Sequence, residues 1–187
     1  SGADIEPMAK AMLNGATLAL SFKDKAARVD MKMGIMGSTV AITDDSKKAG
    51  VVLMNMMGQK MAIVMDEEQI QKTSEQGKDM DVKVTGKTKE IAGYTCKEAI
   101  VKDGEGNEME IWYTDKIVPA NGSNQYAYSG IEGFPLEMEV LQDGMLMKMV
   151  AKKVNTEKMN DELFSTKVPK GYKIMSQEEL EQMGQGR

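Results

Sequence analysis

The chain has 187 residues and a formal net charge of −5, with 41% hydrophobic and 28% charged residues. This balance is typical of a soluble globular protein and excludes a disordered or fibrous one. The acidic charge lacks the positive field on which non-specific nucleic-acid binding depends. The sequence has no histidine, the commonest general base and metal ligand, and its single cysteine, Cys96, has no partner for an intrachain disulfide.

The chain shows no apolar run of the ~20 residues that a membrane-spanning helix requires. It begins with Ser1 and Gly2 rather than Met. We therefore expect a processed or trimmed form, in which the lack of a signal segment does not decide location.

A helix is predicted first, with Asp4 as its N-cap and Asn14-Gly15 as its stop. From Gly15 onward, apolar and polar residues alternate with the period of two that is typical of half-buried strands. The strands predicted on this basis cover residues 16–23, 27–33, 38–43, 50–57, 60–65, 80–88, 95–102, 108–114, 136–142 and 145–153.

Two further helices are predicted from capping boxes, in which a cap side chain and an acid or amide three residues later satisfy each other's backbone N–H groups. Asp66 and Gln69 begin a helix that ends at Gly77, and Ser176 and Glu179 begin the last helix. A short helix near Asn124 is also expected, inside the long connection 116–133.

This order of elements predicts one α+β domain over residues 1–187, dominated by antiparallel strands. With about ten strands, a single sheet must curl strongly, which creates a concave face that something must fill. We expect the helix from Asp66 to pack against the concave side or its rim.

Nineteen methionines stand against three Phe, five Tyr and one Trp. Many of them share a face of their predicted strand. Three interpretations of this pattern are open: core packing, the wall of an adaptable apolar cavity, or thioether ligands for Cu(I). Without histidine or further cysteine, no tight metal site and no cofactor are expected. The candidate ligand-binding residues are Met31, Met33, Met54, Met56, Met61, Met65, Met109 and Met138.

The sequence favours a protein that is not an enzyme. Its carboxylates alternate with apolar residues as a solvated strand face, and Cys96 has no histidine to activate it. The segment 103–107 has the opening of a calcium loop, but Glu108 occupies the place of the loop glycine, so a hairpin turn is favoured. No glycine-rich phosphate loop is present.

Four blocks in the second half resemble an uncharacterised family of secreted and cell-envelope bacterial proteins, over roughly residues 80–175. The blocks are residues 91–97 (IAGYTCK), 110–115 (EIWYTD), 133–138 (GFPLEM), and 163–164 (LF) followed by 169–172 (PKGY). The resemblance implies a fold similar to the LolA and LolB lipoprotein carriers, a strongly curved antiparallel half-barrel whose concave side is covered by short helices. In those carriers the concavity receives lipoprotein acyl chains.

Together these features predict an extracytoplasmic, non-enzymatic domain that binds a lipid, or the lipidated end of another protein, on a methionine-lined concave face. With this function we expect a periplasmic, outer-envelope or secreted location in a Gram-negative bacterium. Peripheral contact with a membrane is also expected, and nucleic acid is not expected as a partner. Two alternatives remain open: an envelope protein–protein interaction module with a filled core, and a Cu(I)-binding methionine-rich protein. The oligomeric state is not predicted.

Overall fold

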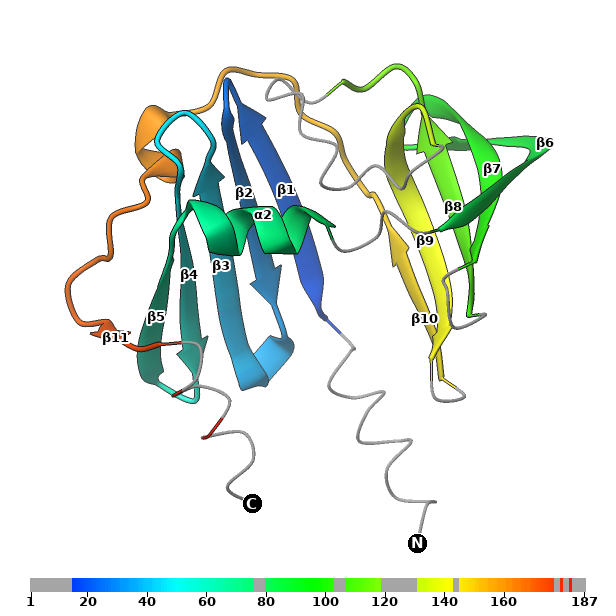
Figure 1. Ribbon diagram of the computed structural model, residues 1–187. Helices are drawn as coiled ribbons and strands as arrows, with labels where there is room; N and C mark the ends of the chain where they lie inside the picture. The colour runs from blue at the N-terminus through cyan, green and yellow to red at the C-terminus, as the bar shows by residue number, and fades with distance from the viewer. Residues whose placement is uncertain are drawn as a thin grey trace, which may run out of the picture. The chain divides into compact units, whose positions relative to one another are not determined.

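The computed structural model describes residues 15–75, 80–102, 107–118, 131–142, 145–176, 179 and 182. The chain divides into two compact units, one of residues 1–71 with 159–187 and one of residues 72–158. Each unit is built on a sheet of its own (Figure 1). The predicted N-terminal helix and the predicted helix near Asn124 lie outside the described residues.

The first unit holds a six-stranded sheet in the order β1-β2-β3-β4-β5-β11. Its first five strands form an antiparallel meander, to which the two-residue β11 adds in parallel beside β5. Two 3-10 turns, η1 (Gly34–Met36) and η2 (Asp161–Phe164), complete the unit. The strands are β1 (Thr17–Lys23), β2 (Ala26–Lys32), β3 (Gly37–Asp44), β4 (Ala49–Met56), β5 (Gln59–Met65) and β11 (Lys173–Ile174).

The second unit holds a five-stranded antiparallel sheet in the order β10-β9-β8-β7-β6. One of its faces carries an apolar core around Ala99, Ile111 and Tyr113, and the other carries a core around Cys96 and Trp112. The strands are β6 (Asp81–Ile91), β7 (Tyr94–Lys102), β8 (Glu108–Thr114), β9 (Phe134–Gln142) and β10 (Met145–Val150).

The helix α2 (Glu67–Glu75) follows β5 directly and crosses one face of the first sheet (Figure 1). Its predicted capping box is confirmed, because the Asp66 N–H donates to Gln69 Oε1 at 3.0 Å and the Gln69 N–H donates to Asp66 Oδ1 at 2.9 Å. Ile70, its one strongly apolar residue, is buried. The hydrogen bonds of the second predicted box, between Ser176 and Glu179, are also present, although most of the helix beyond them lies outside the described residues.

All ten predicted strands are present, and a mostly β, antiparallel fold with few helices is confirmed. The prediction of one single sheet is wrong, because the strands form two sheets, and the parallel strand β11 was not predicted. Alternation identifies a strand and pairs it with its hairpin neighbour, but it carries no signal for the break that α2 introduces between β5 and β6. The single domain over residues 1–187 stays a prediction.

Candidate functional site

One face of the first sheet carries no charged residue at any described register position of β1 to β5. Residues opposite each other in an antiparallel ladder share a face, so the register identifies the members of this surface, which we call the uncharged face. They are Leu18, Leu20, Phe22, Ala27, Val29, Met31, Gly37, Thr39, Ala41, Thr43, Gly50, Val52, Met54, Met56, Gln59, Met61, Ile63 and Met65.

The opposite face of the same sheet, which we call the charged face, has a different composition. Its register positions include Lys23, Arg28, Asp30, Lys32, Asp44 and Lys60. The segment around η2 is held on this face: Arg28 Nη1 donates to the Leu163 carbonyl at 2.8 Å and Lys23 Nζ donates to the Met159 carbonyl at 3.2 Å. The first sheet is therefore strongly two-sided.

Three of the candidate methionines stand in one row across the uncharged face. Met31 on β2 lies opposite Thr39 on β3, which lies opposite Met54 on β4, which lies opposite Met61 on β5. Met56 and Met65 lie on the same face, and Met33 follows β2 directly.

The uncharged face is covered unevenly. At β4 and β5, Met54 and Met61 are buried in a cluster with Ile63 and Met175. At β1 and β2, Leu18 is 38% exposed and Met31 is 40% exposed. The exposed large apolar side chains of this face therefore lie on β1 and β2, although Ala27 on β2 is buried and Gln59 on β5 is exposed.

The sequence predicted that Met109 and Met138 continue the surface formed by the other candidate methionines, but they do not lie in the same sheet. They lie on β8 and β9 of the second sheet, partly buried against the core of Ala99, Ile111 and Tyr113. The eight candidate methionines are therefore divided between two sheets, and their role in ligand binding stays a prediction.

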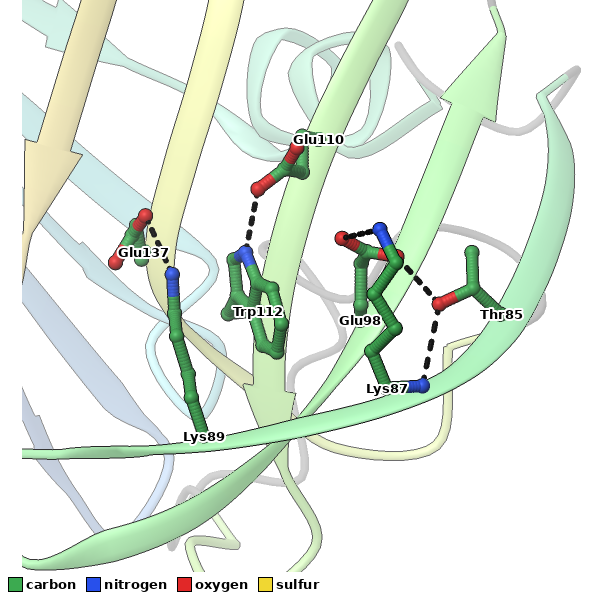
Figure 2. A network of polar contacts seen from close by, with 7 residues as sticks. All are labelled: Thr85, Lys87, Lys89, Glu98, Glu110, Trp112 and Glu137. Atoms are coloured by element: carbon green, nitrogen blue, oxygen red, sulfur yellow. Dashed lines mark hydrogen bonds and ion pairs between the residues drawn. The ribbon is translucent and has the colours of Figure 1, made fainter.

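A polar row in the second unit was missed. Glu98 on β7, Trp112 on β8 and Glu137 on β9 are direct cross-strand neighbours, and both glutamates are buried, with 2% and 5% exposure. Figure 2 shows the contacts around them. The Trp112 Nε1–H donates to Glu110 Oε1 at 2.6 Å.

Each buried glutamate is satisfied by groups from neighbouring strands. Glu98 accepts a hydrogen bond from Thr85 and pairs with Lys87 at 2.9 Å, both on β6. The β6 ladder is irregular between Val84 and Thr88, and Gly86 has φ +85° there, a conformation that favours glycine. This bulge presents Thr85 and Lys87 to the carboxylate.

Glu137 binds two lysines. Its Oε1 lies 2.7 Å from Lys89 Nζ and 2.7 Å from Lys148 Nζ, and Lys148 also pairs with Glu139 at 3.1 Å. The network therefore joins β6, β9 and β10.

Both buried carboxylates are held ionised. The hydrogen bond from Thr85, opposed by burial and aided by Lys87, lowers the pKa of Glu98. Burial acts to raise the pKa of Glu137, but hydrogen bonds from Lys148 and Lys89 outweigh it and lower that pKa. A glycosidase acid needs a carboxyl whose pKa is raised, so this pair lacks the asymmetry of an acid and a base.

Cys96 is fully buried, and burial raises the pKa of its thiol. A nucleophilic cysteine needs the opposite shift. Among the described residues, no group of three or more Asp, Glu, Cys or His side chains is arranged to hold a metal ion, and no helix has the length and apolar character to span a membrane.

The sequence matches a domain of unknown function, DUF4412, over residues 7–172. The chain belongs to the DUF4412 family. No match is found among curated proteins. Among solved structures the chain is similar to PNGF-II, with 14% identity and a TM-score of 0.42, over 90% of this chain and 31% of that one. The chain thus spans under a third of the length of that protein.

The DUF4412 match confirms the predicted membership of an uncharacterised family, and it extends over both units rather than the second half alone. The family has no assigned function. A functional argument therefore depends on the two features described above, which are the uncharged face of the first sheet and the buried network around Glu98 and Glu137.

Proposed function

We propose that this DUF4412 chain is a non-enzymatic domain that binds a hydrophobic chain, such as a lipid or the lipidated end of another protein, on the uncharged face. The observation that carries the proposal is the lack of any charge across five strands of a sheet whose opposite face is rich in charge. Exposed apolar side chains at Leu18 and Met31 give a ligand a place to enter.

The composition of the uncharged face favours an acyl chain over other apolar ligands. Its polar members are Thr39, Thr43 and Gln59, and Phe22 is its one aromatic residue. Sugars and ring systems are usually held by aromatic faces with directed hydrogen bonds, which this surface offers sparingly. Flexible methionines suit chains of varied shape, because a thioether repacks at low cost.

The curved half-barrel of the LolA and LolB carriers, an extracytoplasmic location and peripheral contact with a membrane belong to the same proposal. They are supported by the resemblance of the four sequence blocks and agree with an apolar surface on a β-rich unit. The lowered pKa values of both buried glutamates support the non-enzymatic part.

A fluorescent fatty acid titrated into the full chain tests the proposal. Wild type should bind saturably, and Met31→Asp should weaken the affinity by tenfold or more, on the order expected for a charge placed in an apolar site. Val64→Asp is the matched control, because Val64 is 51% exposed and lies on the charged face of β5. Equal losses in the two variants, or no saturable binding to wild type, would contradict the proposal.

The alternative, a protein–protein interaction module, is favoured by β10. This strand is last in its sheet and pairs only with β9 among the described strands, and it exposes Leu146, Met149 and Val150. Such an edge accepts a partner strand. If the protein is such an interaction module, wild type should not bind the fatty acid. Leu146→Lys should then abolish capture of a protein partner.

A further inference from the structure

The C-terminal segment 172–176, which we call the strap, passes around the β5 edge of the first sheet. Tyr172 packs against the core of Ile42, Val51 and Leu53, and the Lys60 ammonium lies 5.8 Å from its ring centroid. Ile42, Val51 and Lys60 lie on the charged face. Three residues later, Met175 is buried beside Met54, Met61 and Ile63 on the uncharged face. The strap is therefore anchored on both sides of one edge.

The second anchor is slight. β11 has two residues, Lys173 opposite Met61 and Ile174 opposite Ala62, and both are exposed. Beyond them the Met175 N–H donates to the Ala62 carbonyl at 2.9 Å, and the Met175 side chain is 6% exposed. One buried side chain and a two-residue ladder hold this half of the strap, which is typical of a segment that opens locally without global unfolding.

We propose that the strap is an intramolecular occupant of the uncharged face, which a bound hydrophobic chain displaces. The inference rests on the proposed function. The Met175 side chain is an unbranched apolar chain, and it fills the place beside Met54 and Met61 that an acyl chain would take. Displacement swings residues 173–176 away from β5, while Tyr172 holds the preceding chain on the charged face.

Competition of this kind has a measurable consequence. A site that must first release its own occupant binds with an apparent affinity reduced by the fraction of open molecules. Shortening the occupant by Met175→Ala should therefore raise the affinity for a fatty acid about tenfold, as expected from the burial of a methionine side chain. Met57→Ala is the matched control, because Met57 lies in the β4–β5 turn and is 86% exposed.

Wild type alone offers a second measurement. Lys173 is paired in β11, whereas Lys170 lies in a turn outside the ladder. Trypsin needs an unpaired backbone, so displacement of the strap should speed cleavage after Lys173 severalfold and leave the initial rate after Lys170 unchanged. Mass spectrometry separates the two products.

The experiment titrates the full chain, as wild type, Met175→Ala and Met57→Ala, with fluorescent dodecanoic acid, and follows tryptic cleavage with and without the acid. Tighter binding by Met175→Ala alone, with faster cleavage after Lys173, is the expected result. Saturable binding with equal affinities in all three proteins and unchanged cleavage after Lys173 would overturn the strap and leave the binding site standing. Binding by none of the three proteins would overturn both. If Met175→Ala does not fold, the cleavage rates of wild type decide.

Discussion

The Lys89 ammonium lies 3.9 Å from the centroid of the Trp112 ring and at the same time donates to Glu137 Oε1 at 2.7 Å. These contacts run from β6 over β8 to β9, although β6 and β9 are separated in the sheet by two strands (Figure 2). One lysine thus combines a cation–π contact with the neutralisation of a buried carboxylate.

Replacing Lys89 by Met should lower the free energy of unfolding by about 2 kcal/mol, because it removes the cation–π contact and leaves the buried Glu137 with one lysine. Urea unfolding followed by the fluorescence of Trp112, the single tryptophan, measures the change. Lys97→Met is the control, because the Lys97–Asp115 pair is exposed at both partners and should matter little. Equal losses in the two variants would show that the Lys89 contacts add nothing to stability.

The lowered pKa values of Glu98 and Glu137 predict a loss of stability in acid. The unfolded chain takes up protons at these groups near their usual value of 4.5, at a higher pH than the folded chain does. Their contribution is therefore fully present above that pH and disappears as the pH falls through the lower folded values.

Urea midpoints of wild type and of the double variant Glu98→Gln/Glu137→Gln, taken between neutral pH and pH about 3, measure this contribution. The double variant should be less stable at neutral pH and should lose less on acidification. The same loss in both proteins would assign the acid sensitivity to other groups, such as Asp44, whose pKa is also lowered: burial raises it, and hydrogen bonds from Lys47 and Ser46 outweigh burial.

Local signals in the sequence were sufficient for the strands and helix starts. The alternation of Val29 and Met31 with Arg28 and Asp30 predicts β2, and the Asp66–Gln69 box predicts the start of α2. These features depend on residues a few positions apart, where backbone geometry fixes which side chains meet.

The arrangement of the strands and the glutamate network depends on residues far apart, and the sequence carries little signal for either. β11 is two residues long, too short for a periodic pattern. Glu98 directly follows the exposed Lys97, and two consecutive charged residues in a strand also fit a solvated edge. The sequence offered one hint, which is the alternation of side chains between the two faces of a strand. Glu98 lies two residues after the buried Cys96 and therefore on the same face of β7, whereas Lys97 lies on the other face.

Met54, Met61 and Met175 bring three methionine side chains into one buried cluster, which raises again the Cu(I) interpretation. We expect no tight Cu(I) site, because the chain has no histidine and Cys96 lies in the other unit. Anaerobic competition with a Cu(I) chelator is the test. Stoichiometric binding that is lost in Met175→Leu, or in the triple variant Met145→Leu/Met147→Leu/Met149→Leu, would overturn this expectation.

We propose that a hydrophobic chain binds on the uncharged face, and the methionine methyl groups allow the position of the bound chain to be measured directly. Protein labelled with ¹³C at the methionine methyl groups, assigned by single Met→Leu variants, is titrated with doxyl-labelled stearic acid. We expect the methyl signals of Met31, Met54 and Met61 to lose intensity first, while those of Met147 and Met149 on β10 persist. Exposure alone would give a different order, because Met149 is 45% exposed whereas Met54 and Met61 are each 8% exposed. Uniform loss across all methyl groups, or loss confined to Met147 and Met149, would contradict binding on the uncharged face.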